Sequence, residues 1–120
     1  MTAENGDMRQ LILPSVFVLL MAAAALAEDV AVVFSRPGCP PCERLKAAIA
    51  EDATLFAGYR LQQVDSSQDR ELAARHGVRS VPTVVIVRNG RQVAKRSGYE
   101  SADDLRDWLD AQKRSRRWRR

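Results

Sequence analysis

A pair of cysteines separated by two prolines, residues 39–42 (CPPC), constrains the fold more than any other feature of this chain. The segment follows residues 30–34, a continuously apolar run rich in β-branched valine, which favours a buried strand. It opens a stretch, up to about Asp52, in which apolar residues recur at helical spacing. We therefore expect a strand, a tight loop and a helix that begins at the cysteines.

Cys39 and Cys42 are the two cysteines of the chain, and both fall in this segment. The unpaired N–H groups and partial positive charge of a helix N-terminus favour a thiolate at Cys39, which makes it the candidate nucleophile. Cys42 lies about one helical turn further along, close enough to form a disulfide with Cys39 and to resolve a mixed disulfide formed there. The pair is predicted to carry out redox chemistry or, alternatively, to bind a metal.

The neighbours of Cys39 bear on the direction of that redox chemistry. Pro40 and Pro41 have no N–H, so the nearest backbone donors for a Cys39 thiolate are the two residues that follow them. Weaker stabilisation of the thiolate moves a cysteine pair toward the reducing end of the scale. Arg36, a cation three residues before Cys39, acts in the opposite direction. On balance we expect a disulfide reductase, with an oxidase as the alternative.

Five further elements follow along the chain. Asn89-Gly90 supplies the positive φ angles of a tight hairpin, so the strands on either side of it are expected to be antiparallel neighbours. The order of elements predicts a parallel pair of strands joined by a crossover helix and extended by that hairpin. This is an α/β fold with a minimal mixed four-stranded sheet and helices on both faces. The five elements are a strand at 59–65, a serine-capped helix within 66–77, strands at 81–87 and 92–96, and an amphipathic closing helix at 101–109 with Leu105, Trp108 and Leu109 on its apolar face.

The first part of the chain differs in kind from the rest. Residues 11–27 carry no charge and end in a small-residue pattern, so we expect a signal peptide cleaved after Ala27. An uncleaved membrane anchor is the alternative, although the apolar stretch is short for a bilayer span. Met8 is a possible true start, because beginning there removes two acidic residues from the segment before the apolar stretch. We expect an exported protein of the bacterial periplasm, divided into a signal peptide at 1–27, a domain at 28–112 and a basic tail at 113–120.

Positive charge is concentrated at the end of the chain. The predicted tail, residues 113–120, carries six Lys and Arg around Trp118, whereas residues 28–112 hold 12 basic and 13 acidic residues. Such a tail could attach to an anionic membrane surface with the indole at the interface, or it could be a solubilising end of the last helix. An exported protein seldom meets nucleic acid, so no nucleic-acid partner is expected.

Three segments of the chain resemble the thioredoxin superfamily: residues 34–42, residues 77–83 (GVRSVPT) and residues 88–98. Their combination is specific, and the resemblance covers nearly all of residues 30–112. It implies a thioredoxin-like fold and a thiol–disulfide oxidoreductase that acts on disulfides of other proteins. The sequence has no nucleotide or flavin fingerprint, so we expect the electron donor to be another protein. We also expect a monomer with no metal, and no cofactor beyond the redox-active disulfide of the two cysteines.

The resemblance assigns a role to Pro82 as well. It implies that the Val81–Pro82 peptide is cis, that this proline faces the cysteines, and that the backbone of Val81 is free to pair with an extended substrate peptide. An ordinary trans proline at the start of a strand is the alternative.

The chain departs from the family pattern at several positions. Val33 stands where thioredoxins commonly have a buried acid, so a proton acceptor for Cys42 is missing from that place. Glu43 is an adjacent substitute or, alternatively, a solvated acid in the first turn of the helix. Gly38 replaces the aromatic residue before the first cysteine. The loop before the cysteines looks more like a glutaredoxin loop, but the paired glycines that glutaredoxins place after the hairpin are not matched, which argues against glutathione use.

A copper protein is the competing interpretation of the cysteine pair. Two thiolates hold Cu(I), and soft ligands favour it. A structural zinc site needs four ligands, and only His76 is left to join the thiols. His76 directly precedes Gly77 and is better explained as a residue at the end of a helix, near the negative end of its dipole.

Overall fold

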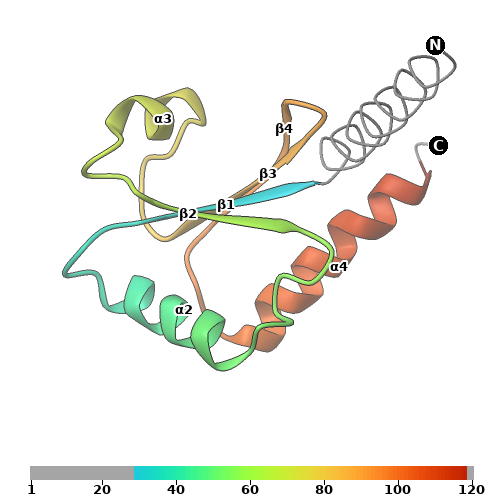
Figure 1. The fold of residues 1–120 in the computed structure, drawn as a ribbon, viewed down its shortest axis with the longest axis horizontal. Coiled ribbons are helices and arrows are strands. Elements are labelled where there is room, and N and C mark those ends of the chain that lie inside the picture. Colours follow the sequence, from blue (N-terminus) through green and yellow to red (C-terminus); the bar gives the residue numbers. More distant parts are fainter. Residues whose placement is uncertain (1–28, 119–120) are drawn as a thin grey trace, which may run out of the picture.

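The computed structural model describes residues 29–118. The predicted signal peptide at 1–27, the possible start at Met8 and the last two residues of the predicted tail lie outside the described residues. The described chain forms one four-stranded sheet with helices packed against it (Figure 1). In chain order the elements are β1 (Val30–Ser35), α2 (Pro40–Glu51), β2 (Arg60–Asp65), α3 (Arg70–Arg75), β3 (Thr83–Arg88), β4 (Arg91–Ser97) and α4 (Ala102–Trp118).

The sheet has the predicted mixed topology. Its strand order is β2-β1-β3-β4, in which β1 and β2 are parallel and the β1–β3 and β3–β4 pairs are antiparallel. The two central strands are the valine-rich ones, with Val33 opposite Val84 and Val32 opposite Val85. Because a strand covered on both faces needs apolar side chains on both, this composition suits the centre of the sheet.

The β3–β4 hairpin turns at Asn89 and Gly90, as predicted. Both residues have positive φ, +53° and +76°, which is what a tight turn between twisted antiparallel strands requires. At the same end of the sheet the Arg88 guanidinium donates from Nε and Nη2 to Asp29 Oδ2, at 3.1 and 3.0 Å, in a largely buried ion pair. This pair connects β3 to the residue that precedes β1.

Side chains of the sheet alternate between two cores on its opposite faces. Figure 1 shows α2 and α4 on one side of the sheet and α3 on the other. On the first side Val33 and Ile86 pack with Leu45 of α2 and Leu109 of α4. On the second side Phe34 and Val85 pack with Ala73 of α3. The predicted apolar face of α4 is confirmed, with Leu105 and Leu109 buried and Trp108 partly buried against the same core.

The helix predicted within 66–77 begins later than expected and has a different cap. Asp69 is its N-cap, and its carboxylate accepts a hydrogen bond of 3.1 Å from the backbone N–H of Leu72. The predicted serine cap is wrong because the serines belong to a turn after β2, where Asp65 Oδ1 accepts hydrogen bonds from the N–H and hydroxyl of Ser67. An aspartate side chain that bonds to the backbone two residues on stabilises a turn in competition with a helix.

Helix α4 extends well beyond residue 109, where the sequence pattern predicted its end. Ser101 caps it, since its hydroxyl oxygen accepts a hydrogen bond of 3.1 Å from the Asp104 N–H. No Gly or Pro interrupts residues 110–118, and the helix runs to Trp118. Much of the segment predicted as a tail is therefore helical. In the part of the chain that the structure describes, no helix is long and apolar enough to cross a membrane.

Candidate active site

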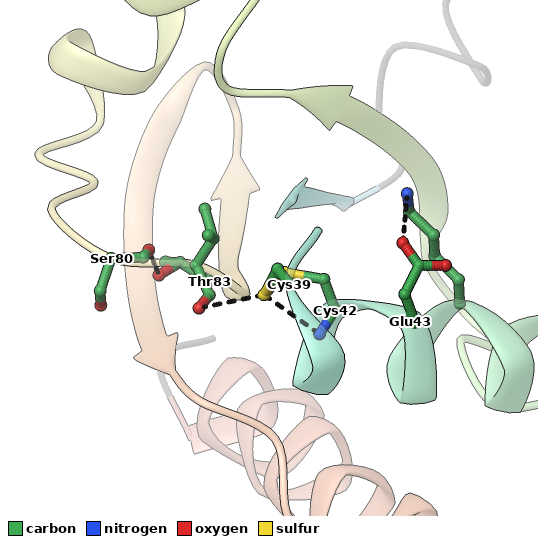
Figure 2. Close-up of a disulfide and its surroundings, with 7 residues drawn as sticks. Cys39, Cys42, Glu43, Ser80 and Thr83 are labelled. Atoms are coloured by element: carbon green, nitrogen blue, oxygen red, sulfur yellow. Dashed lines mark hydrogen bonds and ion pairs between the residues drawn. A yellow bond between two sulfur atoms is a disulfide. The ribbon is translucent and has the colours of Figure 1, made fainter. Parts of the chain in front are cut away.

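Cys39 and Cys42 lie at the start of α2 and form a disulfide with a Cα–Cα distance of 5.2 Å (Figure 2). Cys39 is the N-cap of the helix, with extended backbone, and its Sγ accepts a hydrogen bond of 3.4 Å from the Cys42 N–H. The two sulfur-bearing residues differ in access, because Cys39 is 9% exposed and Cys42 is fully buried. An incoming sulfur can therefore approach Cys39 more readily than Cys42.

The two prolines occupy the first two positions of α2. Their fixed φ suits the first turn of a helix, where an N–H would have no intrahelical partner. Because neither Pro40 nor Pro41 can donate, the Cys42 N–H is the donor that reaches Cys39 Sγ, as predicted. The second predicted donor does not contact the sulfur, since the Glu43 N–H donates to the Cys39 carbonyl at 3.0 Å.

The Val81–Pro82 peptide is cis, the isomer that the resemblance implied. The carbonyl oxygen of Val81 lies 3.8 Å from Cys39 Sγ. In the disulfide this sulfur has no proton, so the approach is a van der Waals contact that becomes a weak hydrogen bond only when Cys39 is a thiol. Within residues 29–118 the backbone N–H of Val81 has no hydrogen-bond partner. The loop thus presents a free donor next to Cys39, the more exposed of the two cysteines.

Hydrogen bonds hold this loop in place from both sides. Thr83 Oγ1 donates to the Ser80 carbonyl at 2.7 Å and lies 3.0 Å from the hydroxyl of Ser97 on β4. The Gly98 N–H donates to the Pro82 carbonyl at 2.8 Å. Sequence reasoning missed Thr83 and Ser97 as supports of the loop. A hydroxyl directly after the proline was the available signal, because a strand that begins there can turn it back onto the loop.

Arg36 and Glu43 flank the disulfide without contacting it. Arg36 is exposed in the loop between β1 and α2. Glu43 points away from the disulfide (Figure 2), and its Oε1 lies 3.7 Å from Nζ of Lys46 in an exposed ion pair. The side chain of Glu43 therefore fits a solvated acid in the first turn better than a proton acceptor for Cys42. Val33 is buried in the apolar core on the α2 side of the sheet.

His76 lies at the C-terminal end of α3, far from the cysteines in sequence. It is the C-cap residue, and its Nδ1 lies 2.9 Å from Gln92 Oε1 on β4. The helix-end interpretation of His76 is confirmed. Among residues 29–118, no three His, Cys, Asp or Glu side chains lie close enough together to hold a metal ion.

Comparison with protein families gives a match over most of the chain. A family model described as a thioredoxin-like domain matches residues 19–113. Protein disulfide-isomerase of Gallus gallus is 34% identical over 104 residues, which cover 77% of this chain and 20% of that protein. Thioredoxin of Haemophilus influenzae is 33% identical over 78 residues, which cover 64% of this chain and 73% of that protein. The chain thus spans about a fifth of the length of the protein disulfide-isomerase but most of the thioredoxin.

Solved structures give the same relationship. A mutant thioredoxin from Halobacterium salinarum NRC-1, in which one asparagine is replaced by glutamine, superimposes with a TM-score of 0.62 at 27% identity, covering 70% of this chain and 74% of that one. The germline-specific thioredoxin Deadhead of Drosophila melanogaster has a TM-score of 0.64 at 23% identity, covering 78% of this chain and 90% of that one. At that identity the second likeness concerns the fold alone.

Proposed function

The chain belongs to the thioredoxin superfamily, and from this membership we propose that it is a protein-disulfide oxidoreductase that cycles between the Cys39–Cys42 disulfide and the dithiol. The observation that carries the proposal is the joined pair at the start of α2, with Cys39 partly accessible and Cys42 buried. The disulfide is itself the redox group, so the proposed cycle uses no other cofactor.

In the reducing direction the Cys39 thiolate attacks one sulfur of a target disulfide. A new bond forms between Cys39 and that sulfur, and the other target cysteine leaves as a thiolate that takes a proton from water. The Cys42 thiolate then attacks Cys39 Sγ, which restores the Cys39–Cys42 disulfide and releases the second target thiolate. Two electrons pass from the protein to the target. A dithiol protein must supply two electrons to begin the next cycle.

The surroundings of each cysteine suit these separate roles. The N-terminus of α2 and the Cys42 N–H stabilise negative charge on Cys39, which is the attacking sulfur. Cys42 is buried beneath it and is positioned to resolve a bond formed at Cys39 rather than to meet a target directly. The free N–H of Val81 beside Cys39 can bond to a carbonyl of an extended target segment, and buried Pro82 keeps that loop against the disulfide.

We assign the reducing direction because few donors stabilise the Cys39 thiolate. A strongly oxidising pair owes its potential to a stabilised reduced form. Here the two prolines remove two backbone donors, and the Glu43 N–H is engaged by a carbonyl. We also propose export to the bacterial periplasm, on the strength of the uncharged segment at residues 11–27 and the small residues that end it.

A trapping experiment tests the cycle. In Cys42→Ser the mixed disulfide cannot be resolved, so incubation of the reduced variant with a disulfide-containing protein should accumulate a covalent adduct. The matched Cys39→Ser variant should form little or none. Equal trapping by both variants would contradict the assigned roles. Absence of adduct, together with tight Cu(I) binding by the pair, would favour the copper interpretation instead.

Direction is decided by the reduction potential, measured by equilibration of the protein against dithiothreitol or glutathione. A value near that of thioredoxin, about −270 mV, supports a reductase, and a value near about −120 mV reverses the assignment to an oxidase.

The end of α4 supports a second, separate proposal of attachment to an anionic membrane surface. Trp118 is 90% exposed at the end of this helix, and Arg114 is exposed four residues before it. Lys113 is less available, because its Nζ lies 5.2 Å from the centre of the Tyr59 ring and contacts the Ala57 carbonyl. Truncation after Arg114 keeps these contacts and removes the rest of the basic segment. Liposome binding that is unchanged by this truncation would refute the proposal.

A further inference from the structure

A pocket of about 250 Å³ lies beside the loop that contacts the disulfide. Val81 forms part of its wall, and Val81 is also the residue whose carbonyl lies 3.8 Å from Cys39 Sγ. The pocket is bounded on its other sides by α3, by the loop before α2 and by the turn after β2. It is therefore continuous with the surface on which a target disulfide must sit. Its polar lining consists of Arg36, Arg70, Arg79, Ser66 and Ser80.

The three arginines of the pocket are uncompensated. Within the described residues none of the three guanidinium groups has a hydrogen bond or an ion pair, and no carboxylate lines the pocket. The two carboxylates next to Arg70 in sequence have partners of their own: Asp69 accepts a hydrogen bond from the Leu72 N–H, and Glu71 forms an exposed ion pair with Arg75. Because residues 28–112 are nearly neutral in total, this concentration of positive charge is local.

We propose that this pocket selects protein disulfides that have acidic residues next to the cysteine attacked by Cys39. The proposal rests on the proposed disulfide exchange at Cys39 and specifies its substrate class. Val81 lines this pocket, and an extended segment that bonds to Val81 advances only about 3.3 Å per residue, so we expect side chains within a few residues of its cysteine to meet the arginines. A pocket of this size is smaller than sites that enclose whole small-molecule ligands, and it suits a few side chains of a polypeptide.

Exposed arginines act mainly on the encounter rate. Complementary charge around a site raises the rate of association and weakens as salt screens it. Each exposed charge pair contributes little by itself, so we expect the arginines together to favour an acidic substrate over its neutral counterpart by about 5- to 10-fold at low salt.

The test compares two disulfide-bonded peptides that differ only in three residues beside the cysteine, glutamates in one and glutamines in the other, with versions that place this block before or after the cysteine. Fully reduced full-length protein is mixed with each peptide, and the second-order rate constant of peptide reduction is measured in a single turnover. The informative quantity is the ratio of the acidic to the neutral rate constant, because any change in the reactivity of Cys39 cancels in it.

Arg70→Gln/Arg79→Gln should lower this ratio to about 2, and Arg36 is retained in that variant because it is also close in sequence to Cys39. Arg60→Gln/Arg91→Gln removes the same charge at the opposite end of the sheet, where Arg60 pairs with Val30, and should leave the ratio as in the native protein. Raising the salt concentration should also reduce the native ratio.

A native ratio near 1 for both placements of the block, with both peptides reduced, would overturn the proposal while leaving the disulfide exchange intact. An equal decrease of this ratio in the two double variants would overturn the proposal as well, since the preference would then come from the total charge of the protein. If neither peptide is reduced and Cys42→Ser traps no protein, the proposed function itself fails.

Discussion

Replacing Pro41 with alanine is expected to make the Cys39–Cys42 pair more oxidising. Pro41 is the second residue of α2, and Cys39 is the N-cap. An N-cap side chain normally accepts from the N–H of the second or third helical residue. In this chain the third, Cys42, donates to Cys39 Sγ at 3.4 Å, while the second has no N–H to donate. Alanine restores that donor next to the sulfur.

The size of the shift follows from the strength of one hydrogen bond to a charged sulfur. A hydrogen bond to a charged group contributes about 1.5–3 kcal/mol, and it stabilises the thiolate of the reduced form rather than the disulfide. For a two-electron couple about 1.4 kcal/mol corresponds to about 30 mV. The reduction potential should therefore become less negative by about 30–60 mV when Cys39 is ionised in the reduced state. Loss of proline rigidity affects the unfolded state of both redox forms equally, and so it does not enter the shift.

The assay is equilibration of each variant against a series of dithiothreitol redox buffers, followed by acid quenching and alkylation of free thiols with a mass-adding maleimide. Pro40→Ala is the matched control, because an N–H at the first helical position does not point at the N-cap side chain, and its shift should stay below about 10 mV. An unchanged or more negative potential in Pro41→Ala, or an equal shift in Pro40→Ala, would refute the reasoning.

Three predictions concern the stability of the fold, each measured by chemical denaturation. Burial, with a further contribution from the charge of Asp29, raises the pKa of Tyr59 to about 12, so the folded state favours the neutral phenol. The contribution of this neutral phenol to the free energy of unfolding is fully present below the unfolded pKa of 10.0 and is lost as pH rises toward 12. Tyr59→Phe also loses the hydrogen bond to the Leu109 carbonyl. Between these pH values its free energy of unfolding should fall by roughly 1–2 kcal/mol less than that of the native protein. Leu109→Ala removes a side chain that is 1% exposed between α4 and the sheet and should destabilise by about 2–5 kcal/mol, whereas Val93→Ala, at an exposed site, should change stability by about 0.5 kcal/mol or less. Asn89→Val places a β-branched residue at φ +53° and should destabilise by about 1–2 kcal/mol, while Asn89→Gly should be tolerated; an equal effect of the two would contradict the turn argument.

Elements whose signals are local were predicted well. The apolar runs of β1 and β3, the Asn89-Gly90 turn and the helix that begins at the cysteines depend on periodicity and turn chemistry within a few residues. The start of α3 was predicted wrongly because two local signals compete there. Serine and aspartate both cap helices. Here the Asp65 side chain accepts hydrogen bonds from Ser67 and places the serines in a turn, so that Asp69 is the cap. The length of α4 was underestimated because the apolar stripe ends before the helix does.

Some features of the candidate site also follow from local sequence alone. The sequence by itself determined which cysteine lies at the helix N-cap and which lies one turn later. The residue at a helix N-cap gains from the free N–H groups, and the residue one turn later does not. It also determined that two of the nearest donors are absent, because Pro40 and Pro41 have none to offer.

Only the tertiary structure decided how exposed each cysteine is and at what distance its neighbours lie; the family resemblance, and no local pattern, implied that the Val81–Pro82 loop faces the cysteines. Burial of Cys42, the 3.8 Å approach of the Val81 carbonyl to Cys39 and the gathering of three arginines at one pocket join segments far apart in sequence. Such contacts arise when the apolar faces of the sheet and helices are buried together, and no local pattern of residues records which loops that packing brings side by side.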